Sequence, residues 1–70
     1  METNLVTPEP EQTWRHSNGA IYTVLFVTNT AVVREGHPPD VVYQGENGNI
    51  WSRPLSDWHR SFTHAPKDAR

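Results

Sequence analysis

Two Asn-Gly pairs, Asn18-Gly19 and Asn47-Gly48, each separate two segments rich in β-branched and aromatic residues. Both residues of such a pair accept positive φ, and Asn-Gly between β-prone segments is the strongest short-range signal of a hairpin. The sequence therefore predicts two antiparallel hairpins. Their strands are expected at residues 13–16 and 20–28 for the first hairpin, and at residues 41–44 and 50–53 for the second.

The remaining segments complete an all-β pattern, or a β-rich one with a single short helical turn. We expect a brief strand at residues 31–33, a loop at 34–40 around Pro38-Pro39, a helical turn at 56–59 capped by Ser56, and an edge strand at 60–62. Residues 20–28 are apolar on both faces, which is typical of a covered central strand. The predicted fold is a small antiparallel meander of roughly five strands, closed into a barrel-like or strongly twisted sheet.

The predicted domain organisation has three parts. Residues 1–12 are expected to form a disordered arm because they are acidic and proline-rich and have little to bury. Residues 13–62 form a single β-rich domain, and the polar residues 63–70 form a flexible tail.

A folded part of this size needs reinforcement, because a small core leaves little net stability. The chain has no cysteine, so a disulfide is excluded, and its three Trp, two Tyr and two Phe favour an aromatic core or a partner subunit. A two-fold homodimer is therefore expected. The residues predicted to form the core are Trp14, Tyr22, Val24, Leu25, Val42, Trp51 and Leu55.

Charge and hydropathy exclude several classes of partner. The net charge is −2 and the six cationic side chains are scattered, which argues against a nucleic-acid surface. No apolar run reaches the length of a membrane span, and no signal peptide is visible at the N-terminus. The absence of cysteine fits a cytoplasmic location.

A block of residues resembles a known family. The order Trp14-x-His16, Gly19-x-x-Tyr22-x-Val24-Leu25, Val41-Val42-Tyr43-Gln44 and Gly48-x-x-Trp51-x-Arg53-Pro54-Leu55 is similar to domain of unknown function 1653, a family of small bacterial and phage proteins. The similarity runs from about Trp14 to Phe62, with Trp58 at a usual Phe position and an unusually proline-rich loop at residues 34–40. The resemblance implies a compact β domain and no particular activity.

No pattern in the sequence indicates catalysis, a metal site or a cofactor. The four histidines lack the paired spacing of a structural zinc site. The serines lack the elbow motif of a nucleophile, and no helix follows Gly45-x-x-Gly48 to bind phosphate. The chain is therefore predicted not to be an enzyme.

Arg53 is the principal candidate for a binding residue. It precedes Pro54 at a strand end, and its guanidinium offers a rigid fork of donors for phosphate or carboxylate. Tyr43 and Trp58 are predicted to form the walls of its site. The alternatives are an ion pair with Asp57 or Asp40, or stacking on a Trp as packing. Trp14 and His16 share a strand face, and either form a ligand shelf or are an ordinary core indole and an edge histidine.

Two functions from different classes follow from these residues. In the first, the chain is a non-enzymatic module that binds or sequesters a small anionic, nucleotide-like ligand at a subunit interface, with an anti-defence role by analogy with phage proteins. In the second, it is an adaptor or inhibitor whose exposed aromatics or strand edge docks on a larger host protein.

Overall fold

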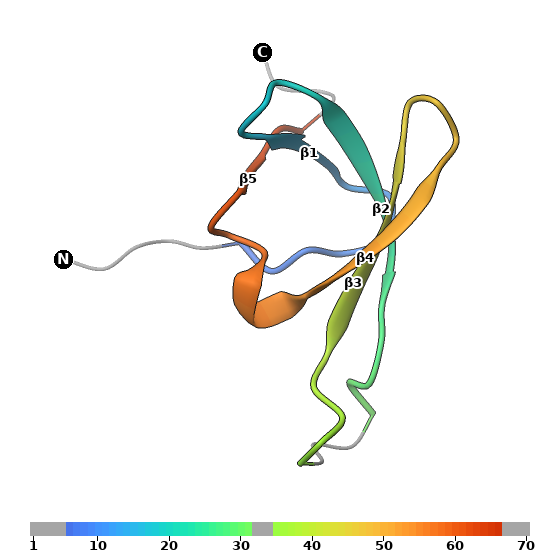
Figure 1. Cartoon of the computed structure of the whole chain (residues 1–70), viewed down its shortest axis with the longest axis vertical. Coiled ribbons are helices and arrows are strands. Elements are labelled where there is room, and N and C mark those ends of the chain that lie inside the picture. The colour runs from blue at the N-terminus through green and yellow to red at the C-terminus, as the bar shows by residue number, and fades with distance from the viewer. Residues whose placement is uncertain (1–5, 32–34, 67–70) are drawn as a thin grey trace, which may run out of the picture.

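Two hairpins and one returning strand organise the chain into a single antiparallel sheet (Figure 1). The computed structural model describes residues 6–31 and 35–66. Its five strands have the order β4-β3-β2-β1-β5. The elements are β1 (Thr13–His16), β2 (Ile21–Val27), β3 (Asp40–Gly45), β4 (Ile50–Pro54), the 3-10 turn η1 (Leu55–Asp57) and β5 (Phe62–His64).

Both predicted hairpins are confirmed, and each turn is closed by a hydrogen bond from its glycine. The amide of Gly19 donates to the carbonyl of His16 (2.8 Å), and that of Gly48 donates to Gly45 (3.0 Å). In each Asn-Gly pair only the glycine adopts positive φ, 97° at Gly19 and 93° at Gly48. Each turn has a three-residue loop with glycine in the left-handed position. The Asn side chains instead accept a hydrogen bond from the amide two residues on, Ala20 or Asn49.

The sheet curls strongly, although hydrogen bonding does not close it. In the described part of the chain β4 and β5 are its two edges, so closure into a barrel is not confirmed. The predicted meander holds for β1 to β4, whereas β5 crosses back to pair with β1. Four strand spacings would separate these edges by about 19 Å in a flat sheet. The guanidinium carbon of Arg53 on β4 nevertheless lies only 5.3 Å from the ring centroid of Phe62 on β5. The sheet therefore wraps around the side chains on its concave face.

A β-bulge in β2 changes which residues face the core. Val24 pairs with Tyr43 and Phe26 with Val42, so the register shifts at the intervening Leu25. Val24 and Val27 consequently both pack on the core, whereas simple alternation groups Val24 with Phe26. Phe26 turns to the convex face and is 51% exposed. The expectation that both faces of β2 are covered is therefore wrong at this position.

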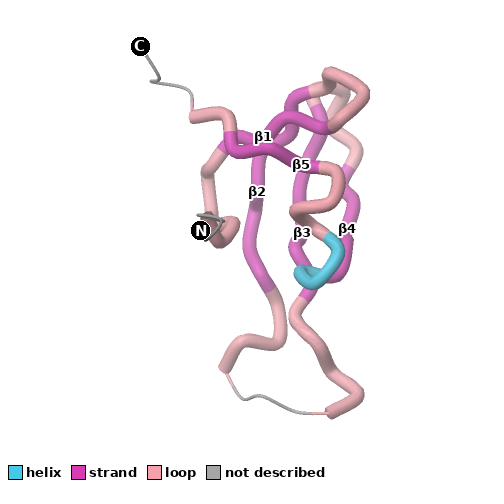
Figure 2. Tube along the Cα trace, turned by 90° about the vertical axis from the view of Figure 1, so that its left-hand side faces the viewer, coloured by secondary structure: helices cyan, strands magenta, loops and turns pink. Residues whose placement is uncertain are grey.

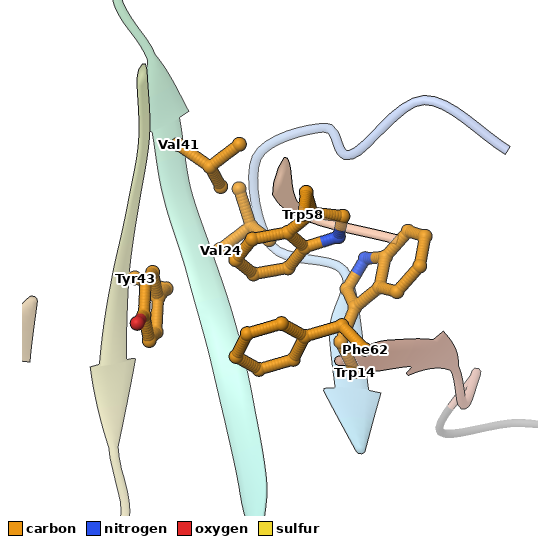
Figure 3. Close-up of a cluster of buried hydrophobic side chains, with 6 residues drawn as sticks. All are labelled: Trp14, Val24, Val41, Tyr43, Trp58 and Phe62. Atoms are coloured by element: carbon orange, nitrogen blue, oxygen red, sulfur yellow. The ribbon is translucent and has the colours of Figure 1, made fainter. Parts of the chain in front are cut away.

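The core is a cluster of aromatic rings between the two sides of the curled sheet (Figure 3). Its buried residues are Trp14, Val24, Val41, Tyr43, Trp58 and Phe62. Of the predicted core, Trp14 and Val24 are buried, and Tyr22, Leu25, Val42 and Leu55 are partly buried. Trp51 is 52% exposed, so its assignment to the core is wrong. It lies on the edge strand, where no neighbouring strand covers it.

A local turn after η1 stacks two of these rings. The amide of Phe62 donates to the carbonyl of Trp58 (3.1 Å), and their rings lie 3.9 Å apart and nearly parallel, at 4°. This four-residue spacing places both side chains on one side of the turn, as in a helix. Ser56 lies inside η1, which follows Pro54 and has no side-chain cap, so the predicted capping role is wrong.

The chain on either side of the predicted domain is part of the fold. Pro8 is fully buried, and the amide of Glu11 donates to the carbonyl of Val24 (2.8 Å). Residues 6–12 thus lie against the sheet where a disordered arm was expected; residues 1–5 lie outside the described part. At the other end, Thr63 and His64 belong to β5 instead of a flexible tail, and residues 67–70 are not described.

The connection between β2 and β3 extends away from the core. Figure 2 shows the described loops at its two sides extending past the ends of the strands. The side-chain amide of Asn29 donates to the carbonyl of Pro38 (2.9 Å), which ties the two described sides of this connection together. The strand expected at residues 31–33 falls mainly on residues 32 and 33, which lie outside the described residues.

Trp14, which is buried, and Trp51, which is half exposed, provide a test of this core. Trp14→Ala removes a fully buried ring, which typically costs about 3–5 kcal/mol, and should unfold a domain with only about 5 kcal/mol of stability. Trp51→Ala should change the free energy of unfolding by less than about 1 kcal/mol, because half of its surface already contacts water. Urea denaturation followed by circular dichroism measures both. A Trp51→Ala variant as unstable as Trp14→Ala would contradict the observed register.

Candidate functional site

Arg53 occupies the concave side of the edge strand β4. Its side chain is partly buried and its guanidinium lies over the ring of Phe62, 5.3 Å from the centroid. One guanidinium nitrogen, Nη1, is shielded from water and has no hydrogen-bond partner. Packing on an aromatic face restricts the rotation of the side chain, so its remaining donors are held in a defined orientation.

No carboxylate in the described residues neutralises Arg53. Asp57, one expected partner, forms an ion pair with Arg60 instead. Asp40, the other, pairs with Pro54 in the ladder, and side-chain alternation directs it to the opposite face of the sheet from Arg53. The alternative in which Arg53 stacks on an aromatic ring is closer to the structure, although the ring is that of Phe62 and not of a Trp. Within residues 6–31 and 35–66 the site thus offers a positively charged group without a counter-charge.

Tyr43 lies beside Arg53 at the floor of the concave face. Burial raises the pKa of the Tyr43 hydroxyl above its ordinary value, and the positive charge of Arg53 acts in the opposite direction. The hydroxyl therefore stays protonated at neutral pH, and its proton is available to donate a hydrogen bond. Its ring packs edge-on against Phe62, with centroids 5.2 Å apart.

The other three predicted site residues divide between the core and its border. Trp58 is fully buried, so it supports the ring of Phe62 from inside the core. Trp14 is also buried, and its Nε1 donates to the Oε1 of Gln12 (3.1 Å). His16 is partly exposed and packs edge-on against Phe62, 5.0 Å between centroids. Phe62 thus connects Arg53, Tyr43, Trp58 and His16, while Trp14 contacts this group through Trp58.

Sequence reasoning missed two residues of this site. Phe62 is expected from the sequence only as part of an edge strand, yet the guanidinium of Arg53 packs on its ring. The four-residue spacing of Phe62 from Trp58 is the sequence feature that could have placed the two rings together. Trp51 was assigned to the core, yet it is exposed two residues before Arg53 and on the same strand face. A shallow hollow of about 270 Å³ lies next to it, lined also by Tyr22, Gly45 and the second hairpin turn.

The described residues contain no group of three or more His, Cys, Asp or Glu side chains arranged to hold a metal ion. Within the same residues, no helix has the length and hydropathy needed to cross a membrane. Comparison of the chain with protein-family models, curated proteins and solved structures finds no match in any of the three. The resemblance to domain of unknown function 1653 stays an expectation from the sequence.

The proximity of Arg53 and Tyr43 predicts a coupled titration. In a Tyr22→Phe background Tyr43 is the only tyrosine, and its ultraviolet absorption reports its ionisation. Its pKa should lie above the ordinary value, and Arg53→Gln should raise it further by removing the opposing charge.

The same shift sets the direction of a pH effect on stability. Because the folded pKa exceeds the unfolded one, the contribution of neutral Tyr43 is fully present below about pH 10 and is lost as the pH rises through the folded pKa. A Tyr43→Phe variant has no hydroxyl to ionise at this position, so its free energy of unfolding should not show this decrease at high pH. A Tyr43 that titrates normally and is unaffected by Arg53→Gln would contradict the described site.

Proposed function

We propose that this chain is a small non-enzymatic binding module that holds an anionic group at Arg53. The observation that carries the proposal is the guanidinium on Phe62, which has a shielded, unpartnered Nη1 and no carboxylate within ion-pair distance among the described residues. A buried donor without a partner costs about 1–3 kcal/mol, and a bound phosphate or carboxylate would recover part of that cost.

The surroundings of Arg53 favour a planar anion such as a nucleotide. Trp51 presents half of its indole to solvent on the same face of β4, and the partly buried Tyr22 lies on the concave face beside Tyr43. Exposed aromatic faces next to a cation are typical of sites that stack a base and bind its phosphate. Trp51 and Tyr22 are therefore proposed as stacking residues, with Tyr43 as a hydrogen-bond donor. The cytoplasmic location and the anti-defence role expected from the sequence rest on the sequence alone.

The adaptor hypothesis has separate support in β4. Ile50 is 59% exposed and Trp51 is 52% exposed, and both belong to an edge strand. Protein partners recognise such edges by adding a strand. An adaptor of this kind depends on the edge and on Trp51, and it tolerates Arg53→Lys.

A ligand screen tests the anion proposal directly. Inorganic phosphate, a series of nucleoside mono-, di- and triphosphates and a series of small dicarboxylates are tested by thermal shift, because a ligand specific to the folded state raises the melting temperature. We expect a phosphate-bearing nucleotide to give the largest rise. A rise with dicarboxylates alone identifies a carboxylate site instead, and no rise with any compound contradicts the proposal.

Substitutions then assign the binding to Arg53. Arg53→Ala should weaken binding of the selected anion by roughly ten- to a hundredfold, and Arg53→Lys nearly as much, because it keeps the charge but loses the fork. Arg15→Ala is the matched control: it removes the same charge from an exposed position on the first strand. Calorimetry measures binding per folded molecule and dichroism measures stability. Normal binding by a destabilised Arg53→Ala would show that Arg53 is only structural.

A further inference from the structure

The edge strand β4 has backbone hydrogen-bonding groups that its sheet does not use. The amide of Gly45 donates to the carbonyl of Asn49 (2.9 Å), and that of Leu55 donates to Pro39 (3.0 Å). Hydrogen-bonded pairs alternate along an antiparallel ladder, so Trp51 and Arg53 form the bonds to β3. The backbone N–H and C=O groups of Ile50 and Ser52 consequently point away from the sheet.

The side chains along this edge also lack covering. Ile50 is the most exposed large hydrophobic residue in the described chain, at 59%, and Trp51 follows it on the other face. Natural sheets protect their edges with charged residues, proline or bulges. Here Arg53 and Pro54 protect only the end of β4, while the segment Ile50–Ser52 carries no such residue. The opposite edge, β5, is shorter, with three residues against five.

We infer that β4 pairs with β4 of a second copy of this chain around a two-fold axis through Trp51. In this register Ile50 of each copy lies opposite Ser52 of the other, so all the outward backbone groups of both residues find partners in four hydrogen bonds. The two Trp51 residues face each other as a non-hydrogen-bonded pair, the position where cross-strand side chains approach most closely. Pro54 falls outside the bonded segment, so its missing amide removes none of these bonds.

Self-complementarity favours a second copy over an unrelated strand. The two-fold operation gives the two indoles the same contact, and it brings the end of β4 that carries Arg53 beside the other copy's hairpin turn. Arg53 of each copy then lies opposite Asn49 of the other, the residue that follows that turn. Two short strands bury less than the ~1,200 Å² typical of a stable interface, so the dimer is expected to be weak. It joins the two sheets into one of ten strands, and it requires no ligand.

Sedimentation and light scattering over a range of concentrations test this pairing. At about 100 µM and above, where weak complexes are populated, wild-type protein should approach twice its 8.0 kDa chain mass. Trp51→Lys should weaken association at least tenfold, because it removes the axial pair and introduces like charges. Ser52→Pro should do the same by removing the outward amide, whereas Ser52→Ala keeps that amide and should still dimerise.

Phe26→Lys provides the matched control. Phe26 is as exposed as Trp51, 51% against 52%, but lies on the convex face of the central strand β2. This variant should dimerise like the wild type. A monomer at every concentration, a dimer that survives both Trp51→Lys and Ser52→Pro, or a dimer lost in Phe26→Lys would overturn the inference. So would growth into larger oligomers, because a two-fold edge pairing closes at two chains. None of these outcomes depends on anion binding at Arg53.

Discussion

The stack of Trp58 on Phe62 is the interaction on which the rest of this structure depends. The rings lie 3.9 Å apart because a single turn, closed from the amide of Phe62 to the carbonyl of Trp58, holds their backbones together. Trp14 and Tyr43 then pack edge-on against Trp58 from opposite parts of the sheet, at 5.5 and 5.1 Å. A short local segment thereby provides the surface around which a five-stranded sheet curls. With no cysteine in the chain, these ring contacts supply the reinforcement that a disulfide gives other small domains.

The curl is also what creates the candidate site. Arg53 and Phe62 lie on opposite edges of the sheet, and only strong curvature places the guanidinium over the ring. The bulge at Leu25 contributes to this curvature, since bulges bend a strand and increase its twist. Because the ladder stops at β4, Arg53 remains partly open on one side and the adjacent Trp51 is exposed. The concave site and the unpaired edge are therefore two consequences of one curled, unclosed sheet.

The sequence predicts local features of this fold well and the environments of single residues less well. Asn18-Gly19 and Asn47-Gly48 mark both hairpins correctly because a turn is determined by the few residues in it. The bulge at Leu25 has no such local signal, and it reverses the expected orientations of Phe26 and Val27. Trp51 is expected in the core because it is a large aromatic residue within a predicted strand, and only the strand order shows that this strand is at an edge. Tyr43 is predicted to border the Arg53 site because Arg53 lies at a strand end among aromatic residues, whereas the contact between Arg53 and Phe62 depends on curvature that periodicity does not encode.

Nuclear Overhauser contacts between Arg53 and Phe62 test the central claim most directly. If the aromatic stack curls the sheet, the side-chain protons of Arg53 should show cross-peaks to the ring of Phe62 and should be shifted upfield by its ring current, as expected for a guanidinium carbon 5.3 Å from the centroid. A flat or loosely twisted sheet would place these residues on edges about 19 Å apart and give neither effect. Cross-strand contacts from β3 to β4 and from β1 to β5, without any contact from Arg53 to Phe62, would contradict this account.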